Sequence, residues 1–118
     1  MNENELEEEI QNKNLNAPRL TPDIIDSLIK EKSFHRLTDV LTVCVLTLQN
    51  GFTVTGESAC ASLSNYNQQI GEDIAFTNAR DKIWPLAGYA LKQKLYEEPL
   101  WHKIDYTMNI YVDYQRKK

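Results

Sequence analysis

The residues most suggestive of chemistry lie in the segment Gly56-Glu57-Ser58-Ala59-Cys60. This segment comes within one residue of the G-x-S-x-G nucleophile elbow, in which a serine is held on a strained turn between a strand and a helix. It lacks the final glycine, and only His102 follows it as a candidate triad histidine. A chain of 118 residues is also too short for the sheet that supports such a site. We therefore expect Ser58 to bond backbone amides in a turn.

Other arrangements for catalysis or metal binding receive no support from the sequence. Cys60 with His35 or His102 would in principle form a nucleophile and its base, but nothing local places them together. The chain contains no C-x-x-C, no H-x-x-x-H and no glycine-rich phosphate loop. The sequence therefore predicts no catalytic residues, no metal site and no cofactor, and an enzyme is the least favoured class of function.

Glu57 is the strongest candidate for a binding group. It lies between a glycine and a run of small residues, so we expect it to be partly buried and to need a cationic partner, which Arg80 or Lys82 would supply. Two interpretations stay open. Glu57 forms either a structural ion pair that fixes a helix against a hairpin, or one edge of a ligand pocket. The residues of that pocket would be Glu57, Ser58, Asn78, Arg80, Lys82 and Trp84.

The pair Arg80 and Trp84 suggests which ligand such a pocket would take. The two residues lie one helical turn apart, at the border of an apolar face. An arginine beside an aromatic ring can hold a phosphate while the ring stacks on a base. The alternative is that Trp84 packs in the core and Arg80 extends from its rim into solvent.

A β-hairpin is predicted to position Glu57. Val40–Leu48 is rich in β-branched residues and apolar at nearly every position, which favours a strand covered on both faces. A buried helix is the competing interpretation of such a run. Asn50-Gly51 decides in favour of the strand, because both residues tolerate the positive φ of a type I′ turn. Phe52–Thr55 then returns as the second strand, which ends or bulges at Gly56.

The first of two predicted helices begins at Thr21-Pro22-Asp23. Thr21 can cap the free amides, Pro22 is pre-set for the first helical position, and the acid complements the helix dipole. Apolar residues follow at helical spacing, and the helix is expected to end near Lys32 or Ser33. Phe34–Asp39 is then interpreted as a connector to the hairpin.

The second predicted helix runs from about Asn67 to Glu97. Several alanines in its apolar stripe allow close packing onto the hairpin. Pro85 removes a backbone donor, which predicts a kink just after Trp84. Glu97-Glu98-Pro99 is expected to stop the helix.

Leu100–Tyr114 supplies a potential third strand, because Tyr106, Met108, Ile110 and Val112 alternate there with Thr107, Asn109, Tyr111 and Asp113. The predicted fold class is therefore α+β. A β-hairpin, or a three-stranded sheet with that C-terminal strand, packs against a short N-terminal helix and a long proline-kinked helix. So small a sheet leaves its edges open, which favours a homo-oligomer. Suitable interface aromatics are Tyr106, Tyr111 and Tyr114.

Charge divides the chain into a tail and a body. Five glutamates before Ile10 carry −5 against a net charge of −4, so the remainder carries +1. Residues 1–17 are predicted to be a disordered acidic tail, with a short acidic helix or a partner-binding arm as alternatives. Residues 18–118 are predicted to form one domain. Neither a secretory leader nor an apolar stretch of about 20 residues is visible, so we expect a cytoplasmic protein with no membrane contact.

Two ordered motifs resemble a known family. They are N-G-F-T-V-T-G-E-S-A-C-A at residues 50–61 and N-A-R-D-K-I-W-P-L-A-G-Y at residues 78–89, with a weaker match at residues 16–22. Across roughly residues 16 to 95 the chain resembles the gene-product-forty-nine-like family of small, uncharacterised proteins from tailed phages and prophages. It departs from that pattern at Ala87, where the family often has a glutamate. The resemblance implies a phage or prophage accessory protein acting in the host cytoplasm, and it implies no known reaction.

Two functions of different class remain open. The first is a binding protein that occupies a host protein and so alters host physiology or defence. The alternative is a protein that sequesters a small nucleotide-like ligand beside Arg80 and Trp84. Nucleic acid is disfavoured as a partner, because the basic residues of the long helix are interspersed with acidic ones and form no basic face.

Overall fold

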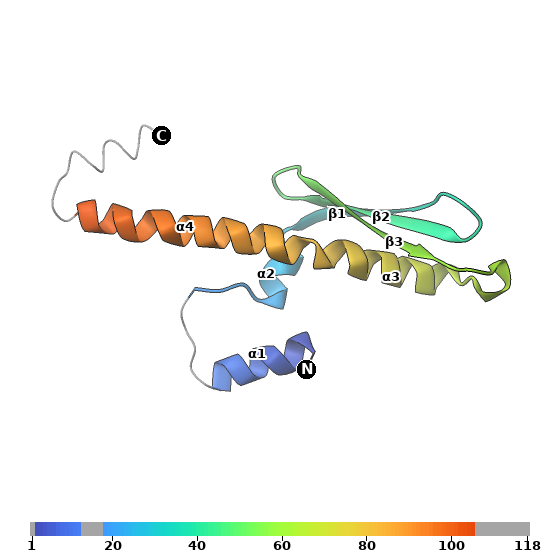
Figure 1. Ribbon diagram of the computed structural model, residues 1–118, viewed down its shortest axis with the longest axis horizontal. Helices are drawn as coiled ribbons and strands as arrows, with labels where there is room; N and C mark the ends of the chain where they lie inside the picture. Colours follow the sequence, from blue (N-terminus) through green and yellow to red (C-terminus); the bar gives the residue numbers. More distant parts are fainter. Residues whose placement is uncertain (1, 13–17, 106–118) are drawn as a thin grey trace. The chain divides into compact units, whose positions relative to one another are not determined.

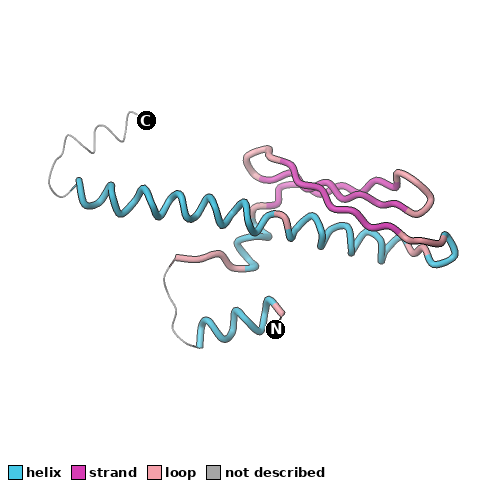
Figure 2. Tube along the Cα trace, viewed as in Figure 1, coloured by secondary structure: helices cyan, strands magenta, loops and turns pink. Residues whose placement is uncertain are grey.

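The structure is a computed structural model that describes residues 2–12 and 18–105. The chain divides into two compact units, Met1–Ala87 and Gly88–Lys118, and the first contains the sheet and its core. The fold class is α+β, as predicted from the sequence (Figures 1 and 2). The elements in chain order are α1 (Glu3–Asn12), α2 (Pro22–Ser27), β1 (Ile29–Arg36), β2 (Leu41–Leu48), β3 (Thr53–Ala59), a 3-10 turn (Leu63–Asn65), α3 (Gln68–Asp81) and α4 (Ile83–Asp105).

The three strands form one antiparallel sheet in the order β1-β2-β3, so β2 is central. Helix α3 runs along one face of the sheet and packs on β2 and β3 (Figure 1). Residues on β2 alternate between buried and half-buried, because successive side chains point to opposite faces of a strand. The buried ones, which face α3, are Thr42, Cys44, Leu46 and Leu48.

The predicted hairpin at Asn50-Gly51 is confirmed. Gly51 has a φ of 90°, which glycine adopts without steric cost. Its N–H donates to the carbonyl of Leu48 at 2.9 Å, and the Leu48 N–H donates to the carbonyl of Phe52 at 2.8 Å. The Asn50 side chain closes the turn by accepting from the Phe52 N–H at 2.9 Å. The register that follows pairs Leu46 with Val54 and Cys44 with Gly56.

The second strand does not end at Gly56 but continues to Ala59. Gly56 is buried because the backbone of α3 lies against it. A Cβ added there would overlap the amide nitrogen of Ala79 and the carbonyl oxygen of Ala75, and would lie 2.8 Å from the Ala79 Cα. Glycine is therefore required by close packing and not by a bulge. The predicted approach of the alanine stripe to the hairpin is confirmed.

The third strand of the described sheet is β1, a segment that was wrongly predicted to be a helix end and a connector. Helix α2 ends at Ser27, with Leu28 as its C-cap, and not near Lys32 or Ser33. The residues interpreted as helix end and connector pair with β2 from Ile29 to Arg36. A central strand that is apolar on both faces is stabilised better by two neighbouring strands than by one. This tertiary pairing outweighs the helical spacing of the isoleucines, from which a longer helix was predicted.

A C-terminal strand was predicted within Leu100–Tyr114 from the alternation that begins at Tyr106, and the structure describes only the residues before that alternation. Residues 100–105 belong to α4, which passes the predicted stop at Glu97-Glu98-Pro99. A proline removes one intrahelical hydrogen bond but does not by itself end a helix. Residues 106–114 of the predicted strand, with its three tyrosines, lie outside the described part of the chain.

The interruption between α3 and α4 falls at Lys82, before the position predicted just after Trp84. Pro85 explains this placement, since a proline ring clashes with the carbonyl of the residue four positions earlier, here Asp81. Helix α3 ends at that residue, and Pro85 becomes the third residue of α4, where a missing N–H costs no intrahelical bond. The helix interruption predicted from Pro85 is thus present, two residues before Trp84.

The core lies between the sheet, α2, α3 and the first turns of α4. Its largest fully buried side chains include Ile25, Leu46 and Ile83. Phe34, Phe76 and Trp84 pack against its margin. The remaining buried members are Cys44, Leu48, Val54, Ala75, Ala79 and Ala87.

Part of the acidic segment is helical. Glu3–Asn12 forms α1, the short acidic helix that stood as an alternative to disorder. Asn2 caps it by accepting from the Glu5 N–H at 2.8 Å. Thr21 caps α2 as predicted, accepting from the Ile24 N–H at 3.2 Å. Among the helices within residues 2–12 and 18–105, none is both long and apolar enough to cross a membrane.

Candidate functional site

Arg80, in the last turn of α3, is the most strongly held charged group among the predicted site residues. Its Nε donates to Asp26 Oδ1 at 2.8 Å and its Nη1 to Glu3 Oε2 at 2.7 Å. Its Nη2 also donates to the carbonyl of Pro22 at 3.3 Å. The side chain is only 13% exposed. The hydrogen bond with Glu3, helped by Asp26 and opposed by burial, raises the pKa of Arg80 above its ordinary value. Arg80 thereby ties α3 to α2 and α1.

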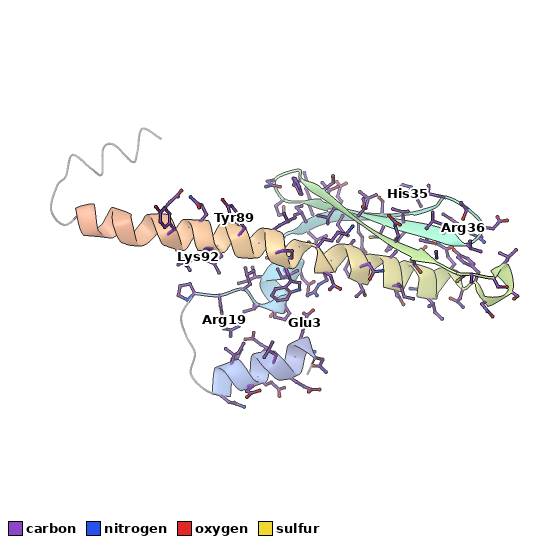
Figure 3. All side chains as sticks on the ribbon, in the orientation of Figure 1. Glu3, Arg19, His35, Arg36, Tyr89 and Lys92 are labelled. Atoms are coloured by element: carbon purple, nitrogen blue, oxygen red, sulfur yellow. The ribbon has the colours of Figure 1, made fainter. Side chains whose placement is uncertain are left out.

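A second ion pair joins α1 to the segment before α2. Arg19 donates to both carboxylate oxygens of Glu7, at 2.6 and 2.5 Å. These hydrogen bonds, with a further one from Gln11, lower the pKa of Glu7 to about 2. The acidic helix thus meets both arginines, Arg19 and Arg80, through carboxylates one turn apart. Glu3 is labelled with Arg19 in Figure 3.

Glu57 does not form the ion pair predicted for it. It is exposed on β3, and in the described part of the chain neither Arg80 nor Lys82 pairs with its carboxylate. The cause is the two-residue period of a strand. Gly56 faces α3, so Glu57 must face the opposite side of the sheet. Only its backbone meets the helix, because the Asn78 side chain donates to the Glu57 carbonyl at 2.8 Å.

The six residues of the predicted pocket are therefore divided between different surroundings. Asn78 lies beside the strand that carries Glu57 and Ser58, whereas Arg80 is turned toward α2. Lys82 is exposed at the end of α3. Trp84 is half-buried and packs against the core, as the second interpretation of that residue expected.

A surface that the sequence did not single out lies along β1. Within the described residues this strand pairs with one neighbour, β2, and it carries Lys30, Lys32 and Arg36 against a single acid, Glu31. The Lys32 Nζ lies 5.0 Å from the centre of the Phe76 ring, and the Arg36 guanidinium lies 4.1 Å from that of Tyr66. Figure 3 labels His35 and Arg36 on this strand. The spacing of these cations could have revealed the surface, had the segment been recognised as a strand.

Tyr66 connects this surface to the core. Its hydroxyl lies 3.1 Å from the hydroxyl of Thr42, which is fully buried, and it also bonds Gln68 near the start of α3. The ring beneath Arg36 is thus fixed from two sides. A guanidinium held over such a ring is oriented without being neutralised by a carboxylate.

Comparison with known proteins assigns the family. A family model described as phage protein (N4 Gp49/phage Sf6 gene 66) matches residues 20–95. The chain belongs to this family. No curated protein and no solved structure matches the chain.

The two motifs that resemble this phage family meet each other in space. The first contains the hairpin turn and Gly56, and the second begins at the end of α3 with Asn78 and Ala79. Gly56 packs on Ala79, and Asn78 bonds the Glu57 carbonyl. In this member of the family the motifs therefore serve the packing of helix on hairpin. Ala87, the one departure noted above, is buried in the same core.

The thiols and other potential ligands of this phage protein do not converge. Cys44 is buried between sheet and helix, and that burial raises the pKa of its thiol. Cys60 lies near the end of β3, where its thiol donates to the Asn65 carbonyl at 3.8 Å. Within the part of the chain that the structure covers, no three His, Cys, Asp or Glu side chains are grouped to hold a metal ion.

Proposed function

We propose that this phage protein is a binding protein that acts in the host cytoplasm without catalysis, by occupying a host protein and so altering host physiology or defence. Membership of a phage family supports the biological setting. The observation that carries the binding role is β1, an edge strand with three cations and one acid. We propose that the partner presents an extended, acidic stretch of polypeptide to this strand.

The edge of β1 that faces away from β2 supplies the backbone part of this recognition. An edge strand presents free N–H and C=O groups that can pair with a strand from another chain. In such strand addition the main-chain hydrogen bonds provide affinity, and alternate side chains provide selectivity. Lysines on an edge also repel a like-charged strand, so β1 disfavours pairing with β1 of another copy.

The side chains of β1 supply the charge complementarity. Lys32 and Arg36 point to the same side of the strand and lie over the rings of Phe76 and Tyr66. These contacts fix the positions of the two charges while no carboxylate satisfies them in the described part of the chain. Acidic side chains four residues apart on an added strand would point to the same side and match that spacing.

The experiment compares two charge reversals of equal size. Lys30→Glu alters the β1 edge, and Lys92→Glu alters an exposed position on α4. Tagged full-length proteins are incubated with host lysate, and the retained host protein is purified and titrated against each variant. We expect wild type and Lys92→Glu to bind equally, and Lys30→Glu to bind at least about tenfold more weakly.

Two results would contradict the proposal. One is equal binding by Lys30→Glu and wild type. The other is a retained partner whose affinity does not fall with added salt, since contacts between exposed charges are screened. The nucleotide-sequestering alternative faces a specific obstacle, because the Arg80 guanidinium must release Asp26 or Glu3 before it could hold a phosphate.

A further inference from the structure

The face of the sheet opposite α3 carries an apolar strip on its central strand. We call this the open face. On β2 it presents Leu41, Val43, Val45 and Thr47, all only half-buried. The solvated face of an antiparallel sheet ordinarily carries polar residues on every strand. Here apolar residues remain on the central strand, although α3 covers the other side (Figure 1).

Polar residues border this strip on both neighbouring strands. The register places His35, Val43 and Glu57 in one row across the sheet. The next rows are Ser33, Val45 and Thr55, and then Glu31, Thr47 and Thr53. An apolar centre with a polar rim is the arrangement typical of a protein interface. The first row is also asymmetric in charge, with a histidine at one end and a carboxylate at the other.

From this pattern we infer that the open face binds a second copy of the chain, in a two-fold sandwich of sheets. A two-fold axis parallel to the strands places β2 over the partner's β2, and β1 over the partner's β3. Each row then lies over the same row of the partner. Val43 and Val45 meet their own equivalents, and His35 meets a Glu57 carboxylate on both sides of the axis.

The dimensions of such a sandwich suit these side chains. Facing sheets pack about 10 Å apart with their strands within about 30° of alignment. At that spacing the inner side chains interdigitate and bury the apolar strip. The His35 ring already has one partner, with its Nε2 3.0 Å from the Ser33 hydroxyl. Its other nitrogen is left to face the carboxylate across the interface.

A second two-fold orientation makes a different prediction, which allows a test. An axis across the strands would place β1 over the partner's β1, and His35 over a Glu31 carboxylate. It would also set Val43 against Thr47. The orientation along the strands keeps apolar residues against apolar residues, and it is therefore the one we assign.

The first measurement is the mass of the full chain by sedimentation equilibrium over a range of micromolar concentrations. We expect a dimer. Val45→Glu places an unpaired charge at the centre of the interface and should weaken the dimer at least about a hundredfold. Thr77→Glu, at an exposed position on α3, should leave the mass unchanged. Circular dichroism shows whether each variant is folded.

The second measurement is a charge exchange that tests the orientation. His35→Glu places a new carboxylate against the Glu57 carboxylate of the other copy, which should weaken the dimer about tenfold. Adding Glu57→Lys should restore the affinity of the dimer. A folded monomeric wild type, or a dimer that Val45→Glu does not affect, overturns the inference. Rescue of His35→Glu by Glu31→Lys in place of Glu57→Lys overturns the assigned orientation. Lys30→Glu should leave the dimer intact, so this test is independent of the binding role of β1.

Discussion

The two faces of the sheet differ in how completely this chain covers them. On the covered face, glycine and alanine bring the backbone of α3 directly onto β3, and Leu46 and Cys44 are fully buried. On the open face, Val43 and Val45 belong to the same strand but stay half-buried. The side of β2 that faces α3 holds the fold together. The other side is the open face, which we propose binds a second copy of the chain.

The charged groups divide in the same way. Arg80 is neutralised by Asp26 and Glu3 and fixes α2 and α1 to α3. Lys32 and Arg36 rest on aromatic rings at the edge of the sheet. Arg80, predicted to line a ligand pocket, thus ties helices together. Lys32, predicted at a helix end, and Arg36, predicted in a connector, form the more accessible surface.

The largest expected effect on the free energy of unfolding comes from a substitution at the closest contact on the covered face. Gly56→Ala should lower the free energy of unfolding by about 3 kcal/mol or more, because the new Cβ meets helix backbone that cannot rotate away. Gly71→Ala is the matched control. Its Cβ would lie 3.5 Å from Thr42 Oγ1, an ordinary contact, so it should stabilise α3 by up to about 1 kcal/mol. Urea denaturation of both variants measures these values, and changes of the same sign would contradict the packing described.

Adjacent residues of β2 should differ sharply. Leu46→Ala leaves a cavity between sheet and helix and should cost about 2–5 kcal/mol of stability. Val45→Ala, on the open face, should cost less than about 1 kcal/mol in the monomer, because little of its environment is lost. Both are measured by denaturation at concentrations where the chain is monomeric. Equal losses would mean that the open face is already covered within one chain.

Removing the Arg80 charge should have a moderate effect. Arg80→Met keeps the aliphatic length but loses the hydrogen bonds to Asp26, Glu3 and Pro22, at a cost of about 1–2 kcal/mol. Lys82→Met, two residues away and exposed, should change stability by less than about 0.5 kcal/mol. If both substitutions are neutral, Arg80 does not tie the helices together.

The smallest effect concerns the acidic helix and pH. The pKa of Glu7 is lowered to about 2 by hydrogen bonds from Arg19 and Gln11. A lowered pKa contributes stability that is present above the ordinary pKa of glutamate, about 4.3, and is lost as pH falls toward the folded value. NMR titration of the Glu7 carboxyl should show this pKa, and Arg19→Gln should return it toward the ordinary value. An ordinary pKa in both proteins would mean that α1 is not held at Arg19.

Local signals predicted the elements that depend on few residues. The hairpin turn required only Asn50-Gly51, and the start of α2 required only Thr21 and the proline after it. The approach of α3 to β3 followed from the small residues in its stripe. Each of these features is decided within one or two turns of chain, where steric rules leave few alternatives.

The incorrect predictions have two causes. Some concern residues whose partners are distant in the sequence, and one arose because the alternation of side chains along the second hairpin strand was not extended to Glu57. The partners of Arg80 lie 54 and 77 residues away along the chain, so no local sequence pattern predicts them. β1 was not predicted as a strand because its first residues also fit the apolar stripe of a helix. The outward direction of Glu57 was available, however, since Val54 and Gly56 face the core and the next residue of a strand must face away.

Hydrogen exchange on the protein with and without its purified host partner tests the central claim most directly. Strand addition at β1 predicts that, within residues 29–36, the backbone amides that point away from β2 become strongly protected when the partner binds, because these N–H groups gain hydrogen bonds. The Lys30→Glu protein should show little protection at the same partner concentration. Protection that appears elsewhere in the chain while β1 stays unchanged would contradict the account.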